Sequence, residues 1–317
     1  MRWLEVNSSK PLEGRIKIPG SKNSSLALLA ASCLADEPVV MSNIPDISDI
    51  RIVFKILEEI GATVEKHPID GTYIIDPRTI NTAVISTKLS SAFRAAYYFV
   101  GALLAKHHKV TIGYPGGDNF VSRPIDQHIK GLKALGAKVE CFDNYYTVEA
   151  DKLTGAEVFF DVVTCGATIN VMLAATLASG RTTLYNAAKD PEVVDTAILL
   201  NNMGAHIYGA GTDTIRIQGV SQLGGCSHSA APDRLIAGSY LIAAGITGGT
   251  ITVEDVIPEH LEACMAKLSE TGLHFETSES SVTAFGDCRI RATRIKTGNF
   301  PMFESDFQQP ITVLLLK

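Results

Sequence analysis

The sequence predicts an α/β protein of the α+β type, built from repeated units that each combine two helices with several strands. A motif in which a helix ends in glycine before a strand recurs along the chain. A short helix that is apolar on all sides precedes this motif each time. The 317 residues, 46% hydrophobic and 20% charged, have the composition of a globular protein and the length for two domains.

The first motif is a helical stretch that ends in Gly-Ala or a near variant and leads into a strand. It reads LEEIGATVEK, LKALGAKVECF, LNNMGAHIYG and LSETGLHFET. Its glycines are Gly61, Gly136, Gly204 and Gly272, spaced by 75, 68 and 68 residues. A nearly fixed period marks one supersecondary unit used several times. Each glycine is expected to end its helix in a left-handed conformation, which strains glycine least.

The second motif is a short helix without a polar face, followed each time by a turn and a β-rich stretch. The copies are SLALLAASCLA (25–35), AAYYFVGALLA (95–105), INVMLAATLA (169–178) and LIAGSYLIAAGI (235–246). A helix that is apolar all round has to be buried. One helix of every unit is therefore expected inside the protein.

A fifth unit begins at FPMFESDFQQPITVLLLK and reaches its apolar helix where the sequence stops. Alone, ITVLLLK would expose an apolar helix, which favours aggregation. We expect a fragment, a shortened version or a degenerate copy of a longer chain. The alternative is an unusual C-terminal helix packed elsewhere.

Charge, targeting signals and cysteines exclude several classes of protein. The net charge is -6 and no basic tract occurs, so nucleic acid is not an expected partner. The N-terminus lacks the apolar core of a signal peptide, and no apolar run could span a bilayer. We therefore expect a cytoplasmic protein without membrane contact. The six cysteines show no CxxC or zinc-ligand spacing, which favours reduced thiols over a disulfide or metal framework.

Polar and charged residues stand where the apolar helices begin. The five openings are Gly20-Ser21-Lys22-Asn23, Arg94, Thr164-Cys165-Gly166-Ala167-Thr168, Pro232-Asp233-Arg234 and Ser305-Asp306. Helix N-termini carry unpaired N–H groups and a partial positive charge, so several of them with lysine and arginine suit a phosphorylated substrate. A simple helix cap explains Asp233 or Asp306 equally well. Solvated charge is a poorer explanation for Lys22 and Arg94, because apolar sequence adjoins both.

One loop, YPGGDNFVSRPIDQH (114–128), differs from the others in composition. Its Pro-Gly-Gly predicts a mobile turn, which would carry Asp118 as a lid carries a catalytic group. The run from Arg123 to Asp126 offers a cation, a fixed backbone and a carboxylate. An ordinary glycine turn before a helix explains the run equally well.

The sequence resembles the enolpyruvyl transferases, and within them the branch that acts on UDP-N-acetylglucosamine. The resemblance runs from about Leu4 to the last residue. It rests on PGSKNSSLALLAA, GYPGGDNFVSRPIDQHIKGLKALGA, CGATINVMLAATLASG, NAAKDPEVVDTAILLNNMGA, APDRLIAG and FPMFESDFQQPITVLL. It implies six βαβαββ units in two domains of three, an inside-out α/β barrel with buried helices and a cleft between the domains. The first domain would span 22–230, and an incomplete second domain would combine 1–21 with 231–317.

The resemblance also implies the substrate-binding residues, which are Lys22, Asn23, Arg94, Arg123, Pro124, Ile125, Asp126, Thr164, Gly166 and Asp306. Lys22 would contact phosphoenolpyruvate and Asn23 the sugar nucleotide. The two arginines would hold phosphates, the 124–126 run would contact the uridine, and Thr164 with Gly166 would hold the diphosphate.

The resemblance implies catalytic roles for three residues: Lys22, Asp118 and Asp306. Asp306 would take the proton from the accepting sugar hydroxyl. Asp118 stands where most members carry a lid cysteine that is linked to proton donation and is alkylated by fosfomycin. For Asp118 to donate a proton near neutral pH, burial or a nearby carboxylate must raise its pKa.

The implied activity is transfer of enolpyruvate from phosphoenolpyruvate to the 3-hydroxyl of UDP-N-acetylglucosamine, the first committed step of peptidoglycan synthesis. It needs proton transfers and electrostatic stabilisation, without a metal or organic cofactor. Ser48 and Val162 replace lysines of many members, and the missing units would supply further arginines. The alternatives are a 5-enolpyruvylshikimate-3-phosphate synthase, a transferase for another nucleotide, and a non-catalytic paralogue that binds UDP-sugar. We expect a monomer or a weak homo-oligomer.

Overall fold

The computed structural model describes residues 3–8, 10–116 and 124–317. The chain divides into two compact units, each with its own hydrophobic core. The large unit is Gly20–Ala231, and the small unit combines Met1–Pro19 with Pro232–Lys317.

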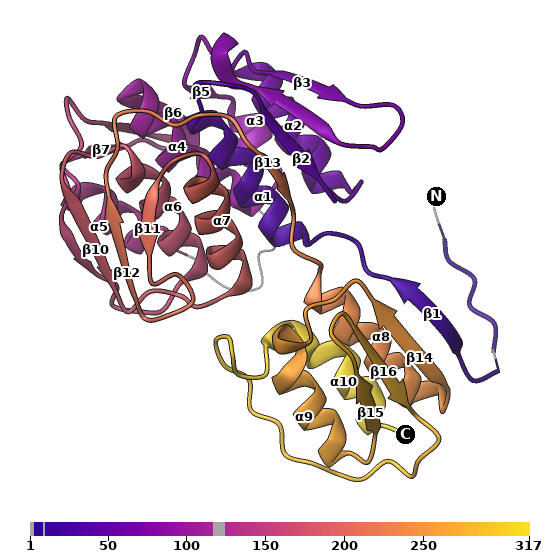
Figure 1. The fold of residues 1–317 in the computed structure, drawn as a ribbon. Coiled ribbons are helices and arrows are strands. Elements are labelled where there is room, and N and C mark those ends of the chain that lie inside the picture. The colour runs from indigo at the N-terminus through magenta and orange to yellow at the C-terminus, as the bar shows by residue number, and fades with distance from the viewer. Residues whose placement is uncertain (1–2, 9, 117–123) are drawn as a thin grey trace. The chain divides into compact units, whose positions relative to one another are not determined.

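The large unit contains three four-stranded sheets (Figure 1). Their strands are β2 (Val39–Ser42), β3 (Thr63–Lys66), β4 (Tyr73–Asp76), β5 (Val84–Ile85), β6 (Lys109–Gly113), β7 (Lys138–Cys141), β8 (Tyr145–Glu149), β9 (Glu157–Phe159), β10 (Arg181–Tyr185), β11 (His206–Tyr208), β12 (Thr214–Gln218) and β13 (Ser227–Ser229). The sheet orders are β13-β2-β4-β3, β5-β6-β8-β7 and β11-β12-β10-β9. Each sheet has one parallel pairing and two antiparallel pairings. The last strand, β13, completes the first sheet and thereby closes the unit.

The helices of the large unit alternate with these strands. They are α1 (Lys22–Ala31), η1 (Ser32–Leu34), α2 (Ser48–Glu59), η2 (Pro77–Thr79), α3 (Thr87–Ser90), η3 (Arg94–Tyr97), α4 (Tyr98–His107), α5 (Asp126–Ala134), α6 (Cys165–Thr176) and α7 (Pro191–Asn202). Helices α1, α4 and α6 are the three apolar helices of the sequence, and α4 packs against both of the others. Leu28, Leu103 and Leu173, one on each helix, are fully buried. The prediction that these helices lie inside is confirmed.

The small unit contains one sheet of the same pattern, ordered β1-β14-β16-β15. Its elements are β1 (Glu13–Lys17), α8 (Arg234–Thr247), β14 (Thr250–Glu254), η4 (Pro258–Leu261), α9 (Glu262–Glu270), β15 (His274–Thr277), β16 (Ser281–Phe285), η5 (Ser305–Phe307) and α10 (Gln308–Leu315). Strand β1 runs parallel to β14 although more than two hundred residues separate them. The start of the chain therefore supplies the first strand of the fourth repeat.

The four repeat glycines have the predicted conformation. Gly61, Gly136, Gly204 and Gly272 have positive φ angles of 98°, 99°, 105° and 109°. Each lies one residue beyond the C-cap of its helix and precedes a strand, as the sequence predicts. The repeated α/β architecture is thus confirmed.

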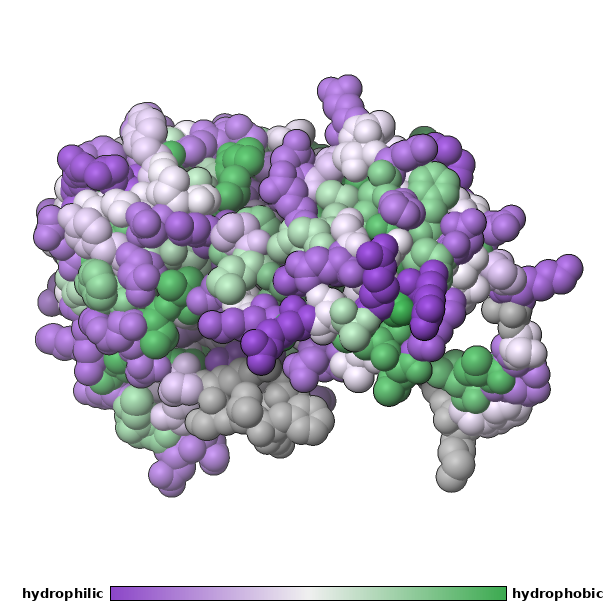
Figure 2. Space-filling view, turned by 90° about the horizontal axis from the view of Figure 1, so that it is seen from below, coloured by the Kyte–Doolittle hydropathy of each residue, from purple (hydrophilic) through white to green (hydrophobic). Residues whose placement is uncertain are grey.

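The surface, the helix lengths and the cysteines add three observations. Hydrophobic and hydrophilic residues are interspersed on the face that Figure 2 displays. Within the described ranges, no helix combines the length and apolar character that crossing a membrane requires. None of the six cysteines, all of which the structure describes, is in a disulfide.

Candidate active site

The opening of α1 is fixed by the end of the large unit. The Ser21 N–H donates to the carbonyl of Ala231 at 2.7 Å, and the Ser21 hydroxyl accepts from the Ser24 N–H at 3.3 Å. Lys22 and Asn23 follow as the first helical residues, Lys22 exposed and Asn23 half-buried. Ser21 therefore caps α1, and Lys22 and Asn23 lie in its first turn.

The opening of α4 leads through η3, which begins at Arg94. The Arg94 guanidinium lies 5.9 Å from the centre of the Tyr97 ring, within reach of a cation–π interaction. Tyr97 in turn reaches the opening of α6, because a Cβ added at Gly166 would lie 2.6 Å from its hydroxyl oxygen. Glycine at position 166 thus leaves space for the tyrosine hydroxyl.

The opening of α6 is capped by Thr164, whose hydroxyl accepts from the Ala167 N–H at 3.5 Å. Thr168 donates to the Thr164 carbonyl at 2.8 Å and accepts from the Ala188 N–H at 3.1 Å. These bonds fix the 164–168 turn, in which Thr164 and Gly166 are half-buried.

A polar cluster joins the openings of α1 and α6 to the start of α7. The Asn23 amide donates to the Glu192 carboxylate at 3.4 Å. Ligand atoms of Cys165, Asp190 and Glu192 lie within 4.8 Å of one another, and this thiol and two carboxylates could hold a divalent cation. Sequence reasoning missed Asp190 and Glu192. The available signal was Asp-Pro-Glu, which reads as the cap and first turn of a helix.

A buried histidine on α5 supports the Arg94–Tyr97 pair. The His128 ring lies 4.4 Å from the Tyr97 ring, centre to centre. Burial lowers the pKa of His128 to about 3, with a further lowering by Arg94 that Asp126 opposes. His128 is therefore neutral near pH 7.

The orientation of His128 follows from Asn170 on α6. The Asn170 side-chain oxygen accepts from the Gly101 N–H at 2.8 Å, so its nitrogen faces His128 Nδ1 at 3.1 Å. Since the amide nitrogen can only donate, Nδ1 is the acceptor and the ring proton is on Nε2.

In the large unit, contacts through Glu192, Cys165 and Tyr97 link three of the expected residues, Asn23, Arg94 and Gly166. Lys22 adjoins Asn23 at the start of α1, and Thr164 caps α6.

Three of the other expected residues stand at the start of α5. Pro124 and Ile125 precede α5, and the exposed Asp126 begins it and accepts from Gln127 at 2.7 Å. Asp118 and Arg123 lie outside the described residues. Asp306 belongs to the small unit, in η5, and is exposed.

The fourth helix opening differs from the anion site that the sequence suggests. Asp233 caps α8, and its carboxylate accepts from the N–H groups of Leu235 and Ile236 at 2.9 and 3.1 Å. Arg234 pairs with Glu304 in a buried ion pair, through nitrogen–oxygen distances of 2.9 and 2.5 Å. At this opening Asp233 is the helix cap that the sequence offered as the alternative, and the Arg234 guanidinium already pairs with a carboxylate.

Comparison with known proteins identifies the family to which this arrangement belongs. Residues 6–315 match the family described as EPSP synthase (3-phosphoshikimate 1-carboxyvinyltransferase). The chain is 46% identical over 317 residues to UDP-N-acetylglucosamine 1-carboxyvinyltransferase 2 of Bacillus anthracis, covering 100% of this chain and 74% of the relative. It is 47% identical over 318 residues to the protein of that name from Geobacillus kaustophilus (strain HTA426), with the same coverage.

Solved structures share the fold. The enolpyruvyl transferase NikO from Streptomyces tendae superposes with a TM-score of 0.83 at 20% identity, over 96% of this chain and 73% of that one. EPSP synthase from Acinetobacter baumannii gives 0.70 at 16% identity, over 98% and 70%. The chain belongs to the EPSP synthase family, whose members among these relatives are enolpyruvyl (carboxyvinyl) transferases.

Proposed function

We propose that this protein transfers enolpyruvate from phosphoenolpyruvate to the 3-hydroxyl of UDP-N-acetylglucosamine. The observation that carries the proposal is the set of contacts that joins three helix openings in the large unit, which carry Lys22, Asn23, Arg94 and Gly166. Helix N-termini and cations together suit phosphate groups. The relatives at 46% and 47% identity support this acceptor over shikimate 3-phosphate.

The chemistry is an addition followed by an elimination. The acceptor oxygen bonds to C2 of phosphoenolpyruvate while a proton adds to the C3 methylene, giving a tetrahedral intermediate. Loss of a C3 proton and of phosphate from C2 restores the double bond. We assign the base for the hydroxyl proton to Asp306, the candidate C3 proton donor to Asp118, and the phosphoenolpyruvate contact to Lys22. As a step of peptidoglycan synthesis, the reaction is expected in the cytoplasm.

Phosphate release tests the proposal directly. The chain is incubated with phosphoenolpyruvate and either UDP-N-acetylglucosamine, shikimate 3-phosphate or no acceptor. We expect phosphate only with the nucleotide sugar. Release with shikimate 3-phosphate would instead support the alternative acceptor, and calorimetric binding of UDP-N-acetylglucosamine without turnover would support a non-catalytic paralogue.

A lysine pair provides a matched control. Lys22→Met should lower kcat/KM by about 100-fold, because one cation that contacts the reacting phosphate is lost. Lys55→Met on the exposed face of α2 should leave it unchanged. Equal activity of the two variants would contradict the role assigned to Lys22.

The aspartate at position 118 leads to a second test. A carboxylate is not alkylated by fosfomycin as a cysteine thiolate is, so we propose that the protein resists this inhibitor. The wild-type chain should keep its activity and intact mass after incubation with fosfomycin, and Asp118→Cys should gain a covalent adduct. An adduct on Asp118 of the wild-type chain would refute the proposal.

A further inference from the structure

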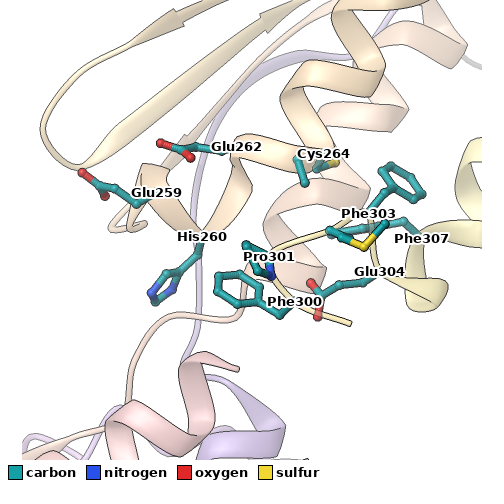
Figure 3. A pocket seen from close by; sticks show the side chains of 11 residues that line it. Glu259, His260, Glu262, Cys264, Phe300, Pro301, Phe303, Glu304 and Phe307 are labelled. Carbon is teal, nitrogen blue, oxygen red and sulfur yellow. The ribbon is translucent and has the colours of Figure 1, made fainter. Parts of the chain in front are cut away.

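A buried ion pair in the small unit lies next to the residue assigned as the base. Arg234 is 5% exposed and Glu304 is 9% exposed, and the guanidinium contacts both carboxylate oxygens. Figure 3 shows the Glu304 carboxylate near the Phe300 ring, and Arg234 lies 5.6 Å from the centre of that ring. The guanidinium is thus held from two sides, by a carboxylate and by an aromatic face.

The position of Arg234 is an unfavourable one for a cation. It is the first residue of α8, where the helix dipole opposes positive charge, and burial removes its hydration. The repeat places Lys22 at the same point of α1, where it is exposed. Replacing a buried ion pair by apolar residues is often neutral or stabilising, so stability alone is a weak explanation for Glu304 at this position.

The carboxylate that Arg234 binds belongs to the turn that carries Asp306. Glu304 precedes η5, and its carbonyl accepts from the Phe307 N–H at 3.2 Å. The Phe307 ring packs on α8 so closely that a Cβ at Gly238 would lie 2.4 Å from it. Phe303 is also buried, so buried phenylalanines anchor the turn at both of its ends. Asp306, between them, is exposed.

We propose that the Arg234–Glu304 pair positions Asp306 for proton abstraction by fixing the turn 303–307 to the start of α8. The inference rests on the proposed function, in which Asp306 is the base. Arg234 and Glu304 are positioning residues, because they act through Asp306.

Glu304→Gln tests the proposal, since glutamine keeps the shape of the side chain and removes its charge. We expect kcat to fall about 10- to 100-fold, the loss that a misplacement of about 1 Å produces, with the KM for UDP-N-acetylglucosamine nearly unchanged. The matched control is Glu254→Gln, which weakens the exposed Arg15–Glu254 pair of the same unit. Its kcat should equal that of the wild-type chain.

A double variant separates positioning from general stability. If Glu304 acts through Asp306, then Glu304→Gln should have no further effect on kcat in an Asp306→Asn background. A loss in the double variant equal to the product of the two single losses would overturn the proposal.

Hydrogen exchange provides a readout that does not need turnover. Amides of 303–307 should exchange about tenfold faster in Glu304→Gln than in the wild-type chain or in Glu254→Gln. Unchanged exchange in this turn would refute the positioning role even if the chain has no transferase activity. Absence of phosphate release from the wild-type chain would instead refute the proposed function.

Discussion

Helices α4 and α8 are two copies of one repeat element in different surroundings. Each is apolar and has an arginine at its opening, Arg94 in η3 before α4 and Arg234 as the first residue of α8. Each ends on a residue with positive φ, His108 at 61° and Gly248 at 73°. Every residue of α4 from Tyr98 to Ala105 is buried. On α8, by contrast, Ile236 and Tyr240 are each 37% exposed.

The neighbours explain the difference. Helix α4 packs between α1 and α6 in the large unit, whereas the helices that contact α8 within the described small unit are α9, α10 and the short η4 and η5. Exposed apolar side chains continue on α10 at Val313 and Leu315. The same pattern thus produces full burial only where sibling repeats surround the helix. An apolar sequence pattern indicates that a helix favours burial. The number of repeats packed around the helix determines how much of its surface is buried.

The largest expected effect comes from removing core volume in the large unit. Leu173→Ala on α6 should lower the opening free energy of the large unit by about 3 kcal/mol, because the side chain is fully buried. The counterpart Ile236→Ala on α8 should cost less than about 1 kcal/mol, because water already contacts that side chain. Native-state hydrogen exchange resolves the two units, and similar losses in both would break the comparison.

The next effect concerns glycines inside the two helices. A Cβ at Gly101 would lie 2.1 Å from the backbone carbonyl oxygen of Asn170, so Gly101→Ala should cost about 2 kcal/mol. The atoms nearest to a Cβ at Gly245 would be the side-chain ends of Leu273 and Leu314, at 2.9 to 3.0 Å. There the higher helix propensity of alanine, about 1 kcal/mol, should offset the crowding. Urea unfolding measures both, and equal destabilisation would contradict the looser packing of α8.

A smaller, pH-dependent effect is confined to the large unit. The pKa of His128 falls from 6.5 to about 3 on folding, so between these values the unfolded state binds the extra proton. Stability should therefore fall as the pH decreases from 6.5 towards 3, by at most about 1.4 kcal/mol per pH unit, and be insensitive to His128 above 6.5.

The measurement uses tyrosine fluorescence, because eight of the nine tyrosines lie in the large unit. Urea midpoints are compared between wild type and His128→Gln at pH 7.5, 6 and 5. The wild-type chain should lose more stability on acidification than the variant. The ring lies near Arg94, which adds to the effect of burial, and near Asp126, which opposes it. Matching slopes would show that burial does not keep the His128 ring neutral.

Local requirements made much of the fold predictable from the sequence. Many helices end in a residue with positive φ, and the four repeat glycines mark four such points before a strand. Apolar helices need burial, which located α1, α4 and α6. Strands β1 and β13 are different, because each pairs with a strand that is distant in the sequence. Their sheet partners depend on topology, which the local pattern does not encode.

Some residues of the candidate site could also be predicted from local sequence, and others could not. Lys22, Arg94 and Gly166 could be anticipated because charge or glycine at an apolar helix opening is locally unusual. Glu304 could not be anticipated, because its ion-pair partner, Arg234, lies seventy residues earlier in the sequence. Pairing across such a distance is a property of the folded unit, and so is the Asn23–Glu192 contact.

The smallest expected effect comes from exposed apolar side chains, one in each unit. Val313 on α10 is 52% exposed and Ile198 on α7 is 48% exposed. Val313→Thr and Ile198→Thr should each change the opening free energy by less than about 0.5 kcal/mol, because little apolar area leaves or enters water. If the exposure of the side chain determines the change in opening free energy, whichever unit it belongs to, the changes for Val313→Thr and Ile198→Thr should agree within error. A loss above about 1 kcal/mol for Val313→Thr alone would mean that this face of α10 is covered in solution.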